Sequence, residues 1–482
     1  MKYIAAVDQS TSASKAFLVD ERGEIARRAS RPHRQYYPAP GRVEHDAQEI
    51  FENVCAIIDE VTDGISAGDI AALALTNQRE TTVIWDRKIG VPVCPAVVWQ
   101  DTRGEALCRE LEAQGEKVRL LTGSALSPYL PASKIGVLLR ENPDLRRRAE
   151  AGELCMGTIE SYLAFRLGGK FVTDVSNASR TQLFDINRLA FSDELTGLFG
   201  IPGALLPEKV LPSDGSFGEY RGIPITGVLG DSFATLFGQG CQTPGTAKVS
   251  YGTGTSVMVN IGEKPLVLKS GLTTAVAYGF EGKVAYEIEG NITCSGDTLM
   301  WLKDGLNLFS SLDELEALAR SVPDALGVQL VPAMAGLGAP FFDTDARALI
   351  RGMTRGTTRA HIARAALESM AQRVADVFEV IRADSGFDVT RLMADGGGSR
   401  NTLLMQMQAD LADCELCCAQ ASELSALGAA YMAGLATGVY KSFDDIPARH
   451  LEGRRYAPEM DAATRAKMRA DWAKAIACAR MR

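Results

Sequence analysis

The feature that most constrains the fold of this chain is a short unit that occurs twice. In each copy, two apolar stretches flank a turn rich in Ser, Thr and Gly: "VDQSTSASKAFLVD" at residues 7–20 and "TAKVSYGTGTSVMVN" at residues 246–260. Alternating apolar residues around such a turn are typical of an antiparallel hairpin. The first hairpin continues into a third strand, "EIARRASR" at residues 24–31, which predicts an antiparallel meander. Because 482 residues are too many for one hydrophobic core, the repeated unit predicts two related domains that share a cleft.

The remaining pattern is that of an α/β protein. Short apolar runs such as "AALALT", "TTVIWD" and "AVVWQD", the last of which contains Trp99, predict further strands in the first half, and helices are expected at residues 104–121 and 134–140. The strongest helical periodicity covers residues 357–386, with Thr358 as its cap and Gly386 at its end. Strands and helices then alternate from residue 391 to residue 438, and a final helix with one apolar stripe closes the chain.

No low-complexity linker separates the halves, so we expect a tight hinge. The best candidate is residues 230–245, where several glycines gather with Pro244. The predicted domains are therefore residues 1–241 and 242–482. At the start of this segment, "GDSFATLFGQG" follows an apolar run and predicts a short helix with Asp231 as its N-cap.

Composition excludes several classes of function. The formal net charge of −9 disfavours binding to nucleic acid or to an anionic membrane. We find no run of 18 apolar residues, and an acid at Asp8 comes too early for a signal-peptide core, so we expect a cytoplasmic protein without membrane insertion. None of the four histidines lies in an HExxH pattern. If the protein moves protons, a carboxylate is the expected base.

The common nucleotide-binding motifs are absent. The sequence contains no GxxxxGK[ST] loop and no GxGxxG after its first strand. Three turns instead combine hydroxyls or bare backbone behind apolar strands: "DQSTSASK", "SYGTGTS" and "DGGGSRN". Hydroxyl and backbone N–H groups in such turns can bind phosphate oxygens.

These segments resemble the FGGY family of carbohydrate kinases, within the actin/hexokinase superfamily, and most closely its glycerol kinase branch. The resemblance rests on the hairpins above and on further segments in the same order along the chain. These are "YYPAPGRVEHD", "LTNQRETTVIWD", "VVWQDTR", "VTDVSNASRTQLFDI", "GLGAPFFDTDARALIRGMTRG", "LMADGGGSRN" and "ALGAAYMAGLATG". It implies two RNase-H-like (actin-like ATPase) α/β domains, with ATP and a polyol or sugar meeting in the cleft. The N-terminal domain would bind the polyol and carry the first phosphate hairpin, and the C-terminal domain would bind the nucleotide.

The resemblance also implies roles for individual residues. Asp231 matches the catalytic base, and with Asp8 it would hold Mg²⁺. The nucleotide residues would be Thr11, Ser12, Lys15, Thr253, Gly296, Gly397 and Asn401. The substrate residues would be Arg79, Glu80, Trp99, Tyr129, Asp231 and Ser232. An Arg–Glu pair and an aromatic wall suit a polyol, which offers hydroxyl donors and acceptors and a C–H face.

The chain departs from the glycerol kinase pattern at four positions. Ser232 and Phe233 stand where glycerol kinases usually have two glutamines, and Ser256 stands where they place a phenylalanine against the substrate. Met300 occupies a position where glutamine is common. Ser232 and Ser256 are smaller than the usual residues and should enlarge the pocket. Xylulose-type members usually carry Gln-Met-His where this chain has "NQRETT", which favours recognition of a glycerol-like end.

We therefore expect an ATP-dependent kinase for glycerol or a closely related polyol. A kinase for a longer polyol or a ketose, such as erythritol, a pentitol or xylulose, stays open as the alternative. A non-catalytic actin-like ATP-binding protein is a remote third. By analogy with the family, a homodimer or homotetramer is possible.

Overall fold

The computed structural model describes residues 2–419, 423–447 and 453–481. Its first large sheet has six strands in the order β13-β14-β5-β1-β2-β3. The strands are β1 (Tyr3–Gln9), β2 (Ala13–Asp20), β3 (Ile25–Pro32), β5 (Ile70–Asn77), β13 (Glu219–Tyr220) and β14 (Ile223–Gly230). The predicted meander is confirmed, because β2 pairs antiparallel with both β1 and β3. On its other side β1 pairs parallel with β5, which in turn pairs parallel with β14.

The second large sheet has seven strands in the order β17-β18-β16-β15-β21-β22-β23. The strands are β15 (Thr246–Tyr251), β16 (Thr255–Gly262), β17 (Thr273–Phe280), β18 (Lys283–Ile292), β21 (Arg391–Gly396), β22 (Glu415–Cys418) and β23 (Arg455–Tyr456). Here β16 pairs antiparallel with β15 and β18, while β15, β21 and β22 run parallel. The central strands of both sheets therefore share one order and one set of directions, which confirms the predicted two-domain α/β fold.

The helices that flank the sheets follow the apolar pattern of the sequence. Helix α1 (Ala47–Thr62) is capped by Asp46 and buries Ile50, Val54, Ile57 and Val61, which recur at the spacing of one helical face. Helix α12 (Arg359–Ser385) begins after Thr358, which forms a capping box with His361, and it ends at Gly386 in the left-handed conformation. Both ends of α12 agree with the prediction.

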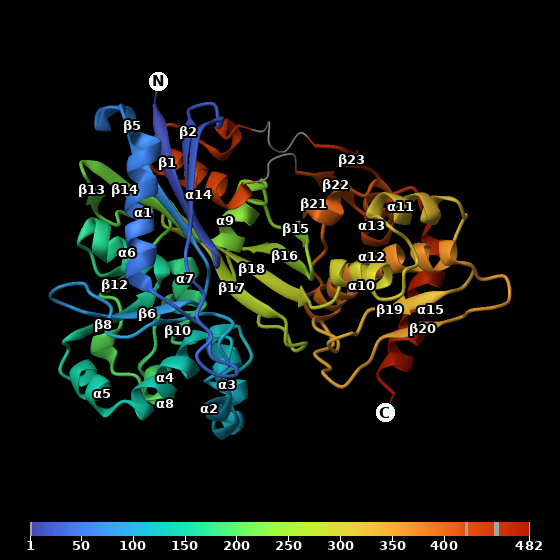
Figure 1. Ribbon diagram of the computed structural model, residues 1–482, viewed down its shortest axis with the longest axis horizontal. Helices are drawn as coiled ribbons and strands as arrows, with labels where there is room; N and C mark the ends of the chain where they lie inside the picture. Colours follow the sequence, from blue (N-terminus) through green and yellow to red (C-terminus); the bar gives the residue numbers. More distant parts are fainter. Residues whose placement is uncertain (1, 420–422, 448–452, 482) are drawn as a thin grey trace.

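Helix α14 (Leu424–Ala436) belongs to the second half of the sequence but packs on the first sheet (Figure 1). It crosses α9 (Asp231–Gly238) at very short range. A Cβ added to Gly428 would lie 1.8 Å from the carbonyl oxygen of Ala234, so only glycine fits there. Residues of both halves consequently share one apolar core, which includes Leu229 and Phe237 from the first half and Met432 from the second. Leu229 comes just before α9 and Phe237 lies within it, so this shared core supports the start of that helix.

Two local predictions were wrong. The helix expected over residues 104–121 is broken into α2 (Glu105–Glu110), a 3-10 turn and α3 (Gly115–Thr122). Gly115 stands at the break, and glycine is a poor residue for a helix interior. The strand expected around Trp99 is only β7 (Ala96–Val97), so Trp99 lies in the loop that follows.

Among the helices within the described ranges, we find none that combines the length and the apolar character needed to cross a bilayer.

Candidate active site

Asp231 lies at the junction of β14 and α9, where the first sheet meets the cleft. The residue is already helical, and Gly230 occupies the N-cap position without a side-chain cap, so the predicted capping role of Asp231 was wrong. Its Oδ1 instead accepts a hydrogen bond from the backbone N–H of Ser232 at 2.6 Å and lies 3.5 Å from Nε of Arg79. The side chain is 36% exposed. The carboxylate therefore remains accessible while its geometry is fixed from two sides.

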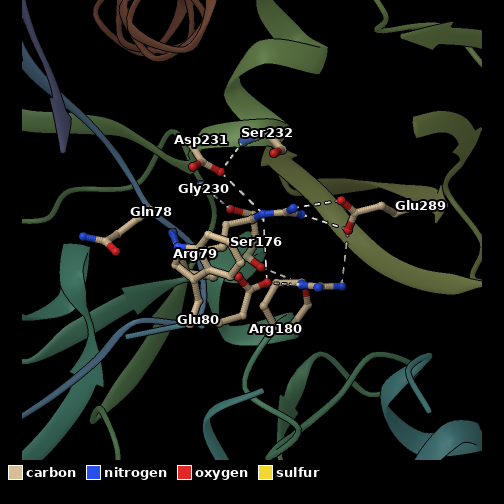
Figure 2. Close-up of polar contacts among 12 residues, drawn as sticks. Gln78, Arg79, Glu80, Ser176, Arg180, Gly230, Asp231, Ser232 and Glu289 are labelled. Carbon is tan, nitrogen blue, oxygen red and sulfur yellow. Dashed lines mark hydrogen bonds and ion pairs between the residues drawn. The ribbon is translucent and has the colours of Figure 1, made fainter. Parts of the chain in front are cut away.

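Arg79 is the centre of a buried group of charges, which we call the Arg79 cluster (Figure 2). The members of the cluster are Arg79, Glu80, Arg180, Asp231 and Glu289. Arg79 donates Nη1 and Nη2 to the two carboxylate oxygens of Glu289 at 3.1 and 2.8 Å. Arg180 donates Nε to Glu80 at 2.6 Å, and its Nη1 lies 3.6 Å from Glu289. Arg79 and Glu80 are thus held in place by partners rather than lying free in the cleft.

Sequence reasoning missed Arg180 and Glu289. Arg180 follows the short helix α7 (Val175–Ser179), and Glu289 lies on β18 in the second sheet. Arg180 fell within a segment that resembles the family, yet nothing in its local sequence indicated a role. Glu289 lies 210 residues from Arg79 along the chain, so only the register of the strands could bring the two together.

Burial and the charges of the cluster change the pKa values of Asp231 and Glu289 in opposite directions. Burial raises the pKa of Asp231, and the nearby Glu80 adds to this effect while Arg79 opposes it. For Glu289, burial also acts to raise the pKa, but the charges of Arg79 and Arg180 outweigh it and lower the pKa to about 2. Glu289 is consequently ionised, whereas Asp231 is a stronger base than a free aspartate.

An aromatic wall connects the substrate residues to the first hairpin. The rings of Trp99 and Tyr129 lie 5.4 Å apart between their centroids. The indole N–H of Trp99 donates to the hydroxyl of Thr11 at 2.9 Å. The ammonium group of buried Lys134 donates a hydrogen bond to the backbone carbonyl of Trp99 at 2.7 Å, which fixes the loop that follows β7. Two of the predicted substrate residues are thereby joined to a predicted nucleotide residue.

The first hairpin carries Asp8, the candidate magnesium ligand. Oδ2 of Asp8 accepts a hydrogen bond from Ser425 at 3.0 Å, while its buried Oδ1 has no hydrogen-bond partner among the described residues. Burial, together with the charge of Asp231, raises the pKa of Asp8 to about 6. Two neighbouring carboxylates, one of which has an unused oxygen, suit a cation. Mg²⁺ commonly uses one or two carboxylates and completes its shell with phosphate oxygens and water.

The other hairpin residues surround this position. The side chain of Ser12 is exposed, and Lys15 forms an ion pair with Glu423 at 3.2 Å. Within the described ranges, no group of three or more His, Cys, Asp or Glu side chains is arranged to hold a metal ion. A magnesium ion here would therefore depend on the bound nucleotide for most of its ligands.

A cavity of about 670 Å³ in the second domain brings the four other predicted nucleotide residues together. They are Thr253, Gly296, Gly397 and Asn401, and Met300 also lines the cavity. Helices α10 (Gly296–Asp304) and α13 (Thr402–Ala412) both begin at this cavity, and helix N-termini favour phosphate. A Cβ added to Gly296 would lie 2.4 Å from the carbonyl oxygen of Gly252, so the tight turn requires glycine. At Gly397 a Cβ would meet nothing within 4 Å.

The departures from the glycerol kinase pattern take different positions in the structure. Phe233 is fully buried, with its ring centroid 4.8 Å from the guanidinium carbon of Arg79, so it supports the Arg79 cluster and does not line the cleft. Ser256 borders a second hollow together with Thr253 and Asn291, and its buried hydroxyl has no partner among the described residues. The change at Ser256, unlike that at Phe233, therefore alters a wall of the cleft.

Comparison with known proteins gives the family. The model of the FGGY family of carbohydrate kinases, N-terminal domain, matches residues 3–238, and that of the C-terminal domain matches residues 247–437. The chain belongs to the FGGY family of carbohydrate kinases.

Individual relatives are similar to this FGGY kinase over almost its whole length. A glycerol kinase of Carboxydothermus hydrogenoformans and one of Agathobacter rectalis are each 44% identical to it, over 99% of this chain and 98% of theirs. The crystal structure of Plasmodium falciparum glycerol kinase with ADP superposes with a TM-score of 0.95 at 33% identity, covering 100% of this chain and 99% of that one. A gluconate kinase of Lactobacillus acidophilus shares the fold, with a TM-score of 0.88 at 21% identity over 99% of this chain and 98% of that one.

Proposed function

We propose that this FGGY kinase transfers the γ-phosphoryl group of ATP to a terminal hydroxyl of glycerol, and that it does so in the cytoplasm. The observation that carries the proposal is the position of Asp231. This accessible carboxylate belongs to the Arg79 cluster and lies close enough to Asp8 to raise the pKa of Asp8. The 44% identity to two glycerol kinases supports glycerol as the acceptor.

In this mechanism Asp231 accepts the proton of the attacking hydroxyl. The hydroxyl oxygen forms a bond to the γ-phosphorus as the bond to the β-phosphate bridging oxygen breaks, and ADP leaves. Because the transition state of such a transfer is loose, positioning contributes most, and the base adds roughly 10²–10⁴-fold. Asp231 is suited to this role because its raised pKa strengthens it as a base.

The other residues bind and orient. Arg79 and Glu80 would hydrogen-bond the remaining hydroxyls, and Trp99 and Tyr129 would cover the C–H face of the polyol. Thr11, Ser12 and Lys15 would approach the phosphates from the first domain.

The nucleotide would lie in the cavity of the second domain. Thr253, Gly296, Gly397 and Asn401 would hold it there. Asp8 and Asp231 would hold Mg²⁺, which supplies neutralisation of the phosphate charge when it is bound.

A second candidate is a kinase for a longer polyol. The observation that favours it is the hydroxyl of Ser256, which borders the cleft without a partner and could bind an additional hydroxyl group. Ser232, beside the base, leaves further room.

The test is ADP release in the presence of glycerol, dihydroxyacetone, erythritol, xylitol, ribitol and xylulose. We expect the highest kcat/KM with glycerol. A higher value with erythritol or a pentitol would favour the second candidate, and no stimulation by any acceptor would refute the proposed kinase activity.

A further inference from the structure

Strand β14 ends at Gly230, directly before Asp231, and this end of the strand has β5 on one side only. The other neighbour, β13, pairs only with the beginning of β14. Backbone N–H groups on the uncovered side need acceptors from elsewhere. The N–H of Val228 is donated to the carbonyl of Ser213 at 3.0 Å, and that of Gly230 to the hydroxyl of Ser176 at 3.1 Å (Figure 2). A single side chain therefore holds the last backbone N–H before the candidate base.

The hydroxyl of Ser176 is itself fixed by the buried polar residues around it. Asp174 caps helix α7 and accepts the backbone N–H groups of Ser176 and Asn177 at 2.9 and 3.0 Å, and its carboxyl group is also hydrogen-bonded to the Ser176 hydroxyl. A hydroxyl has one proton and two lone pairs, so Ser176 can donate to Asp174 while it accepts from Gly230. The side-chain amides of Asn177 and Asn77 bond each other reciprocally at 3.0 Å, which ties α7 to the end of β5.

We infer that Ser176 is a positioning residue, which sets the place of Gly230 and through it the place of the Asp231 carboxylate in the cleft. The inference rests on the proposed phosphoryl transfer. Gly230 has little freedom on its own account, because a Cβ added to it would lie 2.8 Å from Cγ of Arg79. The backbone before Asp231 is thus packed against Arg79 and held by Ser176.

Loss of the Ser176 hydroxyl would leave the Gly230 N–H buried without an acceptor, which favours a shift of the backbone toward another partner. Because a misplacement of about 1 Å can cost about 10²-fold in rate, we expect a partial shift to lower kcat about 10-fold.

Binding of the acceptor should change little. Arg79 is held by Glu289, and Glu80 is held by Arg180, so neither depends on Ser176 for its partner. A loss of kcat without a change in KM is the pattern expected when an interaction of the transition state alone is weakened.

Ser179 offers a matched control on the same helix. It is buried like Ser176, and its hydroxyl accepts the backbone N–H of Val276 at 3.2 Å. Val276 lies on β17 of the second sheet, a strand that does not lead to the base. Ser179→Ala therefore removes a comparable buried hydrogen bond and leaves the contact with Gly230 in place.

The first measurement is amide hydrogen exchange of the protein without nucleotide, metal or acceptor, read by mass spectrometry on peptides that contain Gly230 or Val276. Ser176→Ala should speed exchange at Gly230 about 10-fold, the factor that corresponds to one hydrogen bond of ordinary net strength. Ser179→Ala should speed exchange at Val276 instead. The second measurement is steady-state kinetics with the best acceptor and ATP. We expect kcat to fall about 10-fold in Ser176→Ala, with both KM values near wild type, and to stay near wild type in Ser179→Ala.

Unchanged exchange at Gly230 in Ser176→Ala, or a wild-type kcat in that variant, would overturn the inference. An equal fall of kcat in Ser179→Ala would overturn it as well, since general destabilisation would then explain both losses. If Ser176→Ala does not fold, Ser176→Cys replaces it, because a thiol is a weaker acceptor than a hydroxyl, and a wild-type kcat there would overturn the inference. The exchange measurement needs no substrate, so failure of the proposed function would appear separately, as wild-type protein without acceptor-dependent ADP release.

Discussion

The substitution Asp231→Asn tests the assignment of the base most directly. Asparagine has nearly the same shape, and its Oδ1 can still accept the 2.6 Å hydrogen bond from the backbone of Ser232. The change therefore removes the proton acceptor without removing the contact that fixes the side chain. We expect kcat to fall by about 10²–10⁴-fold, which corresponds to about 2.7–5.4 kcal/mol of lost transition-state stabilisation.

Stability should change little, for a reason that the structure supplies. The lost ion pair with Arg79 is long and partly exposed, so it contributes at most about 1 kcal/mol. Acting in the other direction, the burial that raises the pKa of Asp231 destabilises its ionised form in the folded state at neutral pH. Asparagine removes that penalty, so the two effects oppose each other.

The assay is coupled detection of ADP, together with ATP binding by calorimetry and a thermal melt. A matched control is Asp193→Asn, because Asp193 is also the first residue of its helix, α8 (Asp193–Phe199), and is exposed. The control should behave as wild type. If Asp231→Asn folds, binds ATP and keeps kcat within about 10-fold of wild type, the reasoning that makes Asp231 the base is refuted.

Three further predictions concern other parts of the site. Without magnesium, Asp8→Asn should stabilise the protein at pH 7.5 by up to about 3 kcal/mol. The pKa of Asp8 is about 6 in the folded protein and ordinarily 3.8, so ionisation of this carboxyl destabilises the fold progressively as the pH rises between these values. Urea unfolding should therefore show the gain at pH 7.5 and no gain at pH 3.5. Ser256→Phe should lower kcat/KM for erythritol more than for glycerol, because the ring would fill the hollow beside Thr253; equal losses would contradict the predicted wall. Gly397→Val should raise KM for ATP without lowering the thermal midpoint, since its side chain meets only open space, whereas Gly296→Ala should lower the midpoint as well.

The sequence by itself determined the local elements and the family. Both hairpins, the ends of α12 and the alternation after residue 391 follow from turn residues, caps and apolar spacing, which depend on neighbours along the chain. The residues that resemble nucleotide contacts could also be predicted, and four of them gather in one cavity. Their roles as binding residues stay predictions.

The tertiary structure alone decided which charges meet and which side chains face the cleft. Arg79 pairs with Glu289 because the register of β18 sets that carboxylate opposite the end of β5, and no local pattern encodes a contact between two sheets. Phe233 is a departure from the family pattern in sequence, but the direction of α9 turns it into the core beneath Arg79. Asp231 is likewise no cap, because Gly230 takes that position and frees the carboxylate. These outcomes depend on long-range packing, in which each side chain is oriented by residues that lie far from it in the sequence.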